Sequence, residues 1–131
     1  MMERVSDEDR ETETPVFRPG GISYVRVPSG DPRRTAEFLE AVFDWRVDAG
    51  REDPSFQDGT GHVIGHIDGR MTVAGRAGAR PYVYVESVER TLESVMANGG
   101  EVVTEPYPEG DLVVAVFREP GGSVLGLWQR A

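Results

Sequence analysis

Histidines, tyrosines and a tryptophan are the side chains of this sequence whose types and spacing could do chemistry. His62 and His66 are the only histidines. On one extended strand they would lie about 13 Å apart, at ~3.3 Å per residue, so they cannot share one metal ion unless the strand bulges. One imidazole can act as a general base near neutral pH. No carboxylate clearly orients either ring, which favours a structural, hydrogen-bonded role for both.

Strand alternation places a set of polar and aromatic side chains on one face of the predicted sheets. Valines and leucines of the same strands would then pack on the helices. This pattern predicts an aromatic-lined pocket for a planar or amphipathic organic molecule, whereas the alternative is that the aromatic rings only fill the interface between sheets. The candidate ligand-binding residues are Tyr24, Arg26, His62, His66, Tyr82, Tyr84 and Trp128.

Two members of this face suggest more specific roles. Arg26 would be a buried cation, and a buried arginine needs an acidic partner or an anionic ligand. Gly126, between two inward-facing leucines, would widen the floor of the pocket.

Composition limits the function further. The chain has 131 residues, 23 acids against 14 bases, and a formal charge of −9, so it is long enough for only one core. All the bases are arginines. The charge argues against binding a nucleic-acid backbone or an anionic membrane. The absence of cysteine excludes disulfides and thiolate metal sites. With no apolar run of membrane-spanning length and an acidic rather than signal-like start, a cytoplasmic location is expected.

The chain divides into a tail and one domain. Residues 1–18 are acidic without apolar periodicity, which predicts a disordered tail. Residues 19–131 predict a single domain. Its first half reads as a strand at 22–27, a helix capped by Asp31 and ending near Asp44, and a strand at 45–48. A polar loop follows at 50–61, and Asp68-Gly69 then predicts a hairpin between residues 62–67 and 70–75.

The same order of elements then restarts. A strand at 81–85 precedes a helix that Ser87 caps and Asn98-Gly99 stops. Three strands follow at 101–104, 112–118 and 123–129. The order strand–helix–strand–strand–strand therefore occurs twice, at about 22–78 and 79–131. Each half is too small to be stable alone, so the halves must pack on each other or on another chain.

These segments together resemble the vicinal oxygen chelate superfamily, which includes glyoxalase I, extradiol dioxygenases and bleomycin-resistance proteins. The matching runs are YVRVP at 24–28 with Asp31, AEFLEAVFDW at 36–45, DGR at 68–70 with VAG at 73–75, NGGEVV at 98–103, and EPGGSVLGLWQ at 119–129. Asp44 stands where the family usually has glycine. The resemblance implies an α+β fold of two βαβββ modules, with curled mixed sheets that enclose a cavity.

The resemblance also implies a divalent metal in many members, held by side chains of the first, fourth, fifth and eighth strands. Carried over, these positions fall on Tyr24, on a fourth strand at 70–79 without any acid or histidine, near Arg80, and on Gly126. Glycine offers no ligand and arginine repels a cation. The expectation is therefore that no side chain of this sequence serves as a metal ligand and that no cofactor is required.

The resulting hypothesis is a metal-free, homodimeric protein that captures a small molecule reversibly, as resistance proteins do, and whose negative charge could attract cations. Three alternatives stay open. One is a metal-dependent lyase, isomerase or dioxygenase with displaced ligands drawn from His62, His66, Glu86, Glu101 and Glu105. Another is a metal-free enzyme that uses His66 or Tyr24 as acid or base. The third is a stabilising subunit without a ligand.

Overall fold

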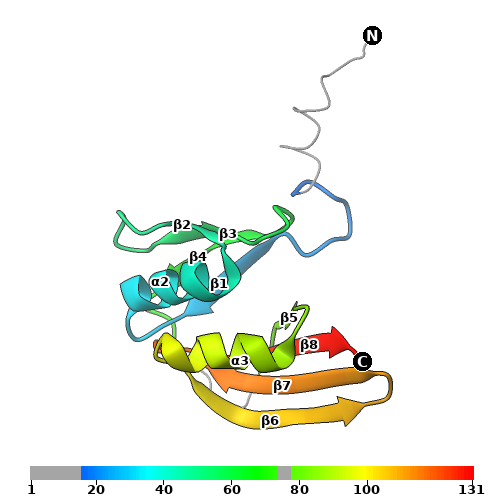
Figure 1. Cartoon of the computed structure of the whole chain (residues 1–131). Coiled ribbons are helices and arrows are strands. Elements are labelled where there is room, and N and C mark those ends of the chain that lie inside the picture. The colour runs from blue at the N-terminus through cyan, green and yellow to red at the C-terminus, as the bar shows by residue number, and fades with distance from the viewer. Residues whose placement is uncertain (1–15, 74–77) are drawn as a thin grey trace.

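The computed structural model describes residues 16–73 and 78–131 (Figure 1). The predicted disordered tail falls mostly on residues 1–15, and the end of the predicted hairpin falls on residues 74 and 75. Both lie outside the described residues. Within the described part of the chain, no helix is long and apolar enough to cross a membrane.

The first module consists of β1 (Tyr24–Pro28), α2 (Pro32–Phe43), β2 (Arg46–Asp48), β3 (Ser55–Gln57) and β4 (Ile64–Asp68). Helix α2 begins as predicted, because the Asp31 carboxylate accepts a hydrogen bond from the Arg34 N–H and proline occupies the first turn. It ends at Asp44, whose φ of 60° is left-handed. Aspartate adopts this conformation more readily than most residues, so it can replace the glycine expected there.

The second module repeats this order with β5 (Tyr82–Tyr84), α3 (Val88–Ala97), β6 (Glu101–Glu109), β7 (Leu112–Arg118) and β8 (Val124–Arg130). The Ser87 hydroxyl caps α3 by accepting from the Arg90 N–H. Gly99, with a φ of +91°, follows the end of the helix. Strand β6 is longer than the predicted 101–104 and contains register shifts against β7.

Both modules form a four-stranded mixed sheet of the same order. The orders are β1-β4-β3-β2 and β5-β8-β7-β6. In each sheet the strand before the helix pairs in parallel with the last strand of the module, and the other pairs are antiparallel. The predicted fold class, α+β with two βαβββ modules, is confirmed.

Two predictions for the first module are wrong. The stretch 50–61, predicted as a loop, contains β3, with Phe56 buried against the core. The hairpin predicted at Asp68-Gly69 does not form in its described part, because residues 70–73 are not a strand. Strand β4 already pairs with β1 on one side and β3 on the other, so it has no free edge for a further strand.

A single core joins the two modules. Helices α2 and α3 lie between the two sheets (Figure 1), and buried residues of all these layers form one cluster. Phe38 of α2 packs against Phe117 of β7, with ring centroids 5.8 Å apart. Since the helices occupy the space between the sheets, the opposite face of each sheet points outward.

A buried polar joint also ties the modules together. The Glu119 carboxylate, at the turn between β7 and β8, is 1% exposed. It accepts hydrogen bonds from the Thr35 hydroxyl at 2.6 Å and from the Gly121 and Ser123 N–H groups at 2.7 and 2.8 Å. Burial raises the pKa of Glu119, while these three hydrogen bonds oppose the rise. Ser29 extends the joint, since its hydroxyl lies 2.7 Å from that of Thr35.

Candidate functional site

Except for His62, the predicted site residues lie on the sheet faces opposite the core, as strand alternation predicted; these faces were expected to line one pocket, and they point outward instead. Val27, Leu125 and Leu127 belong to the core, and Val25, Val83 and Val85 pack against it. The side chains between them face away, and Tyr24, Tyr82 and Tyr84 are 55%, 43% and 48% exposed. The predicted residues thus divide into a group on the first sheet and a group on the second, and no hydrogen bond, ion pair or ring contact joins the groups in the described residues.

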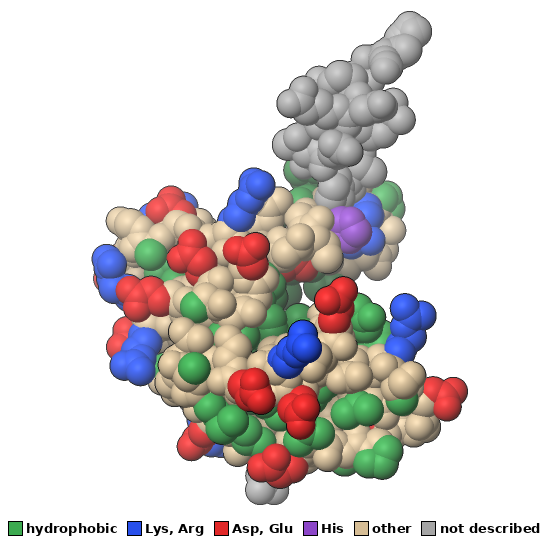
Figure 2. Space-filling view, viewed as in Figure 1, with side chains coloured by type: hydrophobic (Ala, Val, Ile, Leu, Met, Phe, Trp, Pro, Cys, Tyr) green, Lys and Arg blue, Asp and Glu red, His purple; other side chains and the backbone are tan. Residues whose placement is uncertain are grey.

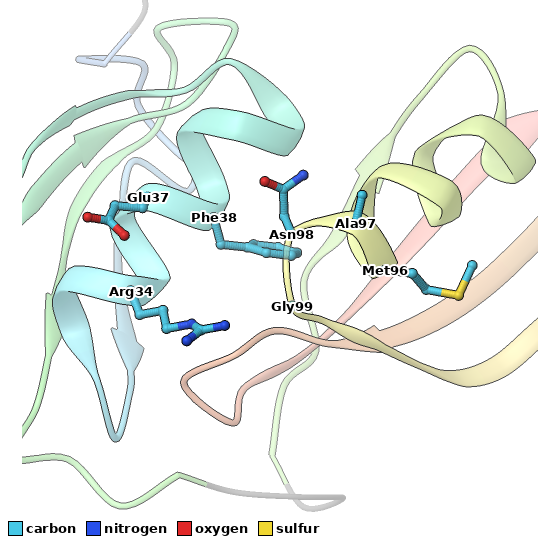
Figure 3. Close-up of a pocket in the computed structure, with 7 residues that line it drawn as sticks. All are labelled: Arg34, Glu37, Phe38, Met96, Ala97, Asn98 and Gly99. Carbon is cyan, nitrogen blue, oxygen red and sulfur yellow. The ribbon is translucent and has the colours of Figure 1, made fainter.

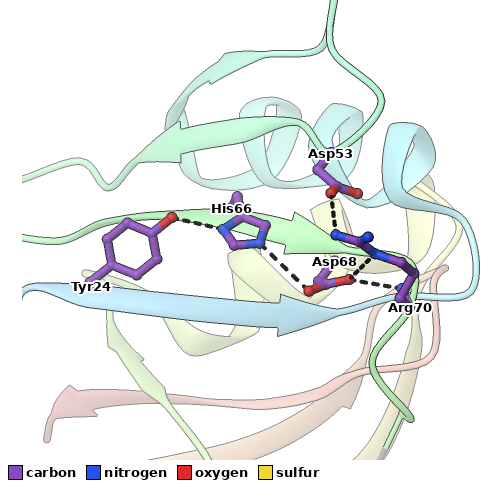
Figure 4. Close-up of polar contacts among 5 residues, drawn as sticks. All are labelled: Tyr24, Asp53, His66, Asp68 and Arg70. Atoms are coloured by element: carbon purple, nitrogen blue, oxygen red, sulfur yellow. Dashed lines mark hydrogen bonds and ion pairs between the residues drawn. The ribbon is translucent and has the colours of Figure 1, made fainter.

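On the first sheet, three side chains form a chain of polar contacts, the Tyr24–His66–Asp68 chain (Figure 4). The Tyr24 hydroxyl lies 2.7 Å from Nδ1 of His66, from the neighbouring strand β4. On the other side of the imidazole, Nε2 lies 3.6 Å from a carboxylate oxygen of Asp68. The imidazole therefore stands between a phenol and a carboxylate.

The Asp68 carboxylate is held in place by the residue that follows the turn. It accepts a hydrogen bond from the Arg70 backbone N–H at 2.8 Å. This hydrogen bond lowers the pKa of Asp68, with smaller lowering contributions from the Arg70 charge and from His66, while burial raises it. Arg70 also lies 3.4 Å from the Asp53 carboxylate. Asp68 is therefore an anion that faces His66.

Asp68 is a residue that the sequence interpretation missed, because it was assigned only to a hairpin turn. A signal for it was present, since residues 66 and 68 of one strand share a face. The expectation that no carboxylate orients a histidine is wrong for His66.

On the second sheet, aromatic rings gather on the outward face of β5 and β8. Tyr84 and Trp128 make an edge contact with ring centroids 4.9 Å apart. The Tyr82 ring lies directly over Gly126, where an added Cβ would fall 2.1 Å from a ring carbon. Gly126 therefore admits the Tyr82 ring and does not widen an open pocket floor, which corrects the expectation for this residue.

Arg26 and His62 have no side-chain partner among the described residues. Arg26 lies opposite His66 in the β1–β4 register and is exposed, so the premise that it is a buried cation is wrong for a single chain. His62 lies just before β4 and is half-buried, and its backbone N–H donates to the Thr60 hydroxyl. Neither residue belongs to the Tyr24–His66–Asp68 chain.

Two hollows lie between the modules. The larger, an apolar groove of about 790 Å³, is seen in Figure 2 as hydrophobic side chains in the gap between the two halves. Its wall includes the stacked rings of Trp45 and Phe56, 5.3 Å apart, and Tyr82 and Tyr84 are its only members from the predicted site. The smaller, about 500 Å³, lies between α2 and α3 and includes Arg34, Glu37 and Asn98 (Figure 3).

The side chains at the implied metal positions do not fit a metal ion. The fourth strand of the first module is β4, not residues 70–79, so it does contain His66 and Asp68. The other positions still offer a phenol, an arginine and a glycine, and the described residues contain no group of three or more His, Asp or Glu that could hold a metal. The residues that the metal-dependent alternative would use as ligands are not gathered in one place either. Glu101, for example, pairs with Arg118 on the second sheet.

Comparison with known proteins identifies relatives of the whole domain. The model of the Glyoxalase/Bleomycin resistance protein/Dioxygenase superfamily matches residues 21–127. CFP32 of Mycobacterium bovis, which carries a glyoxylase name, is 23% identical over 125 residues, covering 86% of this chain and 47% of that protein. The chain thus spans about half the length of this curated relative.

Solved structures show the same fold. A superfamily enzyme from Burkholderia phytofirmans has a TM-score of 0.69 at 16% identity, covering 83% of this chain and 98% of that one. The fosfomycin resistance protein FosX from Mesorhizobium loti has a TM-score of 0.67 at 20% identity, covering 86% and 93%.

Proposed function

Since the chain belongs to the Glyoxalase/Bleomycin resistance protein/Dioxygenase superfamily, we propose that it binds a small organic molecule reversibly and without a metal. The observation that carries this proposal is the outward face of the two sheets, which presents Tyr24, Tyr82, Tyr84 and Trp128 where a metal site would need carboxylates and imidazoles. Exposed aromatic rings with a few polar groups suit planar or amphipathic ligands. The proposed ligand-binding residues are those predicted from the sequence, except His62.

A homodimer would bring the two groups of residues together. Strands β1 and β5 are edge strands of their sheets. At the two ends of β1, the Ser23 carbonyl accepts from the Ile64 N–H and the Ser29 N–H donates to the Asp68 carbonyl. Because successive residues of a strand turn their backbone groups to alternate sides, those of Tyr24 and Arg26 point to the free edge. Free edges are templates for pairing with another chain. With β1 beside β5 of a second copy, Tyr24 and His66 would share one continuous sheet face with the partner subunit's Tyr84 and the partner subunit's Trp128.

A two-fold axis would make this contact twice, and it would create two equivalent sites. Each site would combine the aromatic group of one subunit with the Tyr24–His66–Asp68 chain of the other. The net charge of −9 favours the approach of a cationic ligand, while Arg26 provides a local positive group for a ligand with an anionic part.

Fluorescence of a single tryptophan tests the binding site. The chain has two tryptophans, so Trp45→Phe leaves Trp128 on the outward face, and Trp128→Phe leaves Trp45 in the groove. The probes are two aromatic dyes, the planar, cationic proflavine and the amphipathic, anionic 1-anilinonaphthalene-8-sulfonate. We expect saturable quenching of Trp128 with a Kd in the micromolar range for at least one dye, and a smaller change of Trp45, whose groove shares only Tyr82 and Tyr84 with the proposed site. No saturable change of Trp128 with either dye would contradict the proposed site.

Light scattering during gel filtration tests the dimer. We expect about twice the chain mass for the natural protein. Arg26→Pro removes an N–H at the free edge without removing a bond to β4, so it should give a monomer that keeps its circular dichroism spectrum. A natural protein that elutes as a monomer at 100 μM would show that the two sheet faces do not meet in solution.

A further inference from the structure

The Tyr24–His66–Asp68 chain runs from the surface into the protein. Tyr24 is 55% exposed, the His66 side chain is 19% exposed and the Asp68 side chain is 7% exposed. Of the three, the phenol is thus the group that a molecule arriving from solvent meets first.

The partners of His66 determine where its proton resides. Asp68 places a negative charge 3.6 Å from Nε2 of His66, and this charge favours the tautomer of His66 with the proton on Nε2. Nδ1 then carries a lone pair and accepts the Tyr24 hydroxyl hydrogen at 2.7 Å. The phenol proton is thus directed at a base whose other nitrogen faces an anion. An oxygen nucleophile, a histidine base and an orienting carboxylate are the parts that activate hydroxyl groups in acyl transfer.

We propose that Tyr24 is a nucleophile toward activated acyl groups, with His66 as its general base and Asp68 as a positioning residue. In this step the Tyr24 oxygen attacks the acyl carbon and forms a phenyl ester. The bond from that carbon to the leaving group breaks. His66 Nδ1 takes the phenol proton and passes it to the leaving group, so charge and atoms balance without a further reactant.

This activity goes beyond the proposed ligand binding, because it requires only the three side chains of one subunit. Arg26, exposed on the same face and opposite His66 in the strand register, adds a cation that could hold an anionic group of the acyl donor. The chemical class of substrate is therefore a small acyl compound, with a carboxylate or similar anion near the reactive carbonyl.

N-acetylimidazole tests the proposal without knowledge of the natural substrate. This reagent acetylates phenols, and the chain has neither lysine nor cysteine to compete. The other three tyrosines are internal controls, and Tyr84 is the best matched because it is 48% exposed and contacts Trp128 instead of a histidine. Peptide mass spectrometry gives the acetylation rate at each tyrosine. We expect Tyr24 to react at least tenfold faster than Tyr84. A ratio within threefold of one, or a slower Tyr24, would overturn the proposal.

Variants separate activation from simple exposure. His66→Gln keeps a hydrogen-bond acceptor but removes the base, so the Tyr24-to-Tyr84 rate ratio should fall to about one. Asp68→Asn should lower the ratio about tenfold, whereas Asp111→Asn, the same change at an exposed turn, should leave it unchanged. If His66→Gln keeps the high ratio while its circular dichroism spectrum is native, the histidine is not the base. Dye binding involves no acyl transfer, so its failure and the failure of this proposal are distinguishable.

Discussion

Replacing Glu119 by glutamine tests how the two modules are held together. The change keeps the size and shape of the side chain but substitutes an NH₂ group for one acceptor oxygen. Oε1 accepts from Thr35 and Gly121, whereas Oε2 accepts from the Ser123 N–H. The glutamine oxygen can replace only one of these positions, so at least one buried donor must face the new NH₂ group.

The structure sets the magnitude of the effect. A buried donor without a partner costs about 1–3 kcal/mol, so Glu119→Gln should lower the free energy of unfolding by about 1–3 kcal/mol at neutral pH. Glu119→Ala leaves three donors without their acceptor and should cost about 3–5 kcal/mol, in the range seen when a buried polar network loses its charged member. The matched control is Glu101→Gln, whose exposed pair with Arg118 predicts a loss of about 1 kcal/mol or less.

The difference in free energy of unfolding between the natural protein and Glu119→Gln should depend on pH, which provides a second test. Burial raises the pKa of Glu119 above its ordinary value of 4.5, so its protonated form favours the folded state. The stability that this raised pKa gives is fully present below the pKa of Glu119 in the unfolded chain, and it is lost as pH rises through the pKa in the folded protein. Glutamine does not titrate. The free energy of unfolding of the natural protein should therefore exceed that of Glu119→Gln by more at pH 4 than at pH 7.

Urea denaturation followed by tryptophan fluorescence measures the free energy of unfolding of each protein at both pH values. Equal stability of Glu119→Gln and the natural protein at both pH values would refute the argument that the carboxylate joins the modules. If the difference in free energy of unfolding between the two proteins is smaller at pH 4 than at pH 7, burial does not dominate the pKa of Glu119.

Three further changes have expected outcomes in the same urea assay. Gly65→Ala should destabilise by about 3 kcal/mol or more, because its Cβ would fall 1.9 Å from the Val25 carbonyl oxygen of the neighbouring strand; a loss under 1 kcal/mol would show that β1 and β4 can separate easily. Asp44→Gly should stabilise by about 0.5–1 kcal/mol, because glycine adopts the left-handed φ of 60° without steric cost; a destabilised variant would contradict this. Asp68→Asn should destabilise more at pH 7 than at pH 3, because the lowered pKa of Asp68 gives stability that is fully present above its unfolded value of 3.8 and is lost as pH falls through the lower folded pKa; an equal loss at both pH values would exclude an ionic cause.

Much of the fold follows from local sequence patterns. Caps and turns act within a few residues, so Asp31, Ser87 and Gly99 predicted the ends of α2 and α3. Alternation along a strand depends only on backbone geometry, so it assigned Val27 and Leu127 to the core and Tyr24 and Tyr84 to the opposite face. The repeated order of elements predicted two modules, and their sheets have the same strand order.

Pairing between distant segments is decided only by the tertiary structure. Asp68-Gly69 is a strong local hairpin signal, yet β4 is central in its sheet and has no edge for residues 70–73. For the same reason β3 was missed, since three residues form a strand only when a neighbour offers its backbone. The Glu119 joint links positions 84 residues apart, and no local pattern distinguishes this carboxylate from one in an exposed turn.

The candidate site also combines features that local sequence determines with features that only the tertiary structure decides. Tyr24 and His66 could be assigned to one face from sequence alone, but their contact depends on the parallel register that places Arg26 opposite His66. Asp68, by contrast, shares the face of His66 through the local strand period, and the Arg70 N–H that lowers its pKa follows two residues later. Residue types and strand period are local properties and can be read from the sequence, whereas register and distance between strands arise from packing of the whole core.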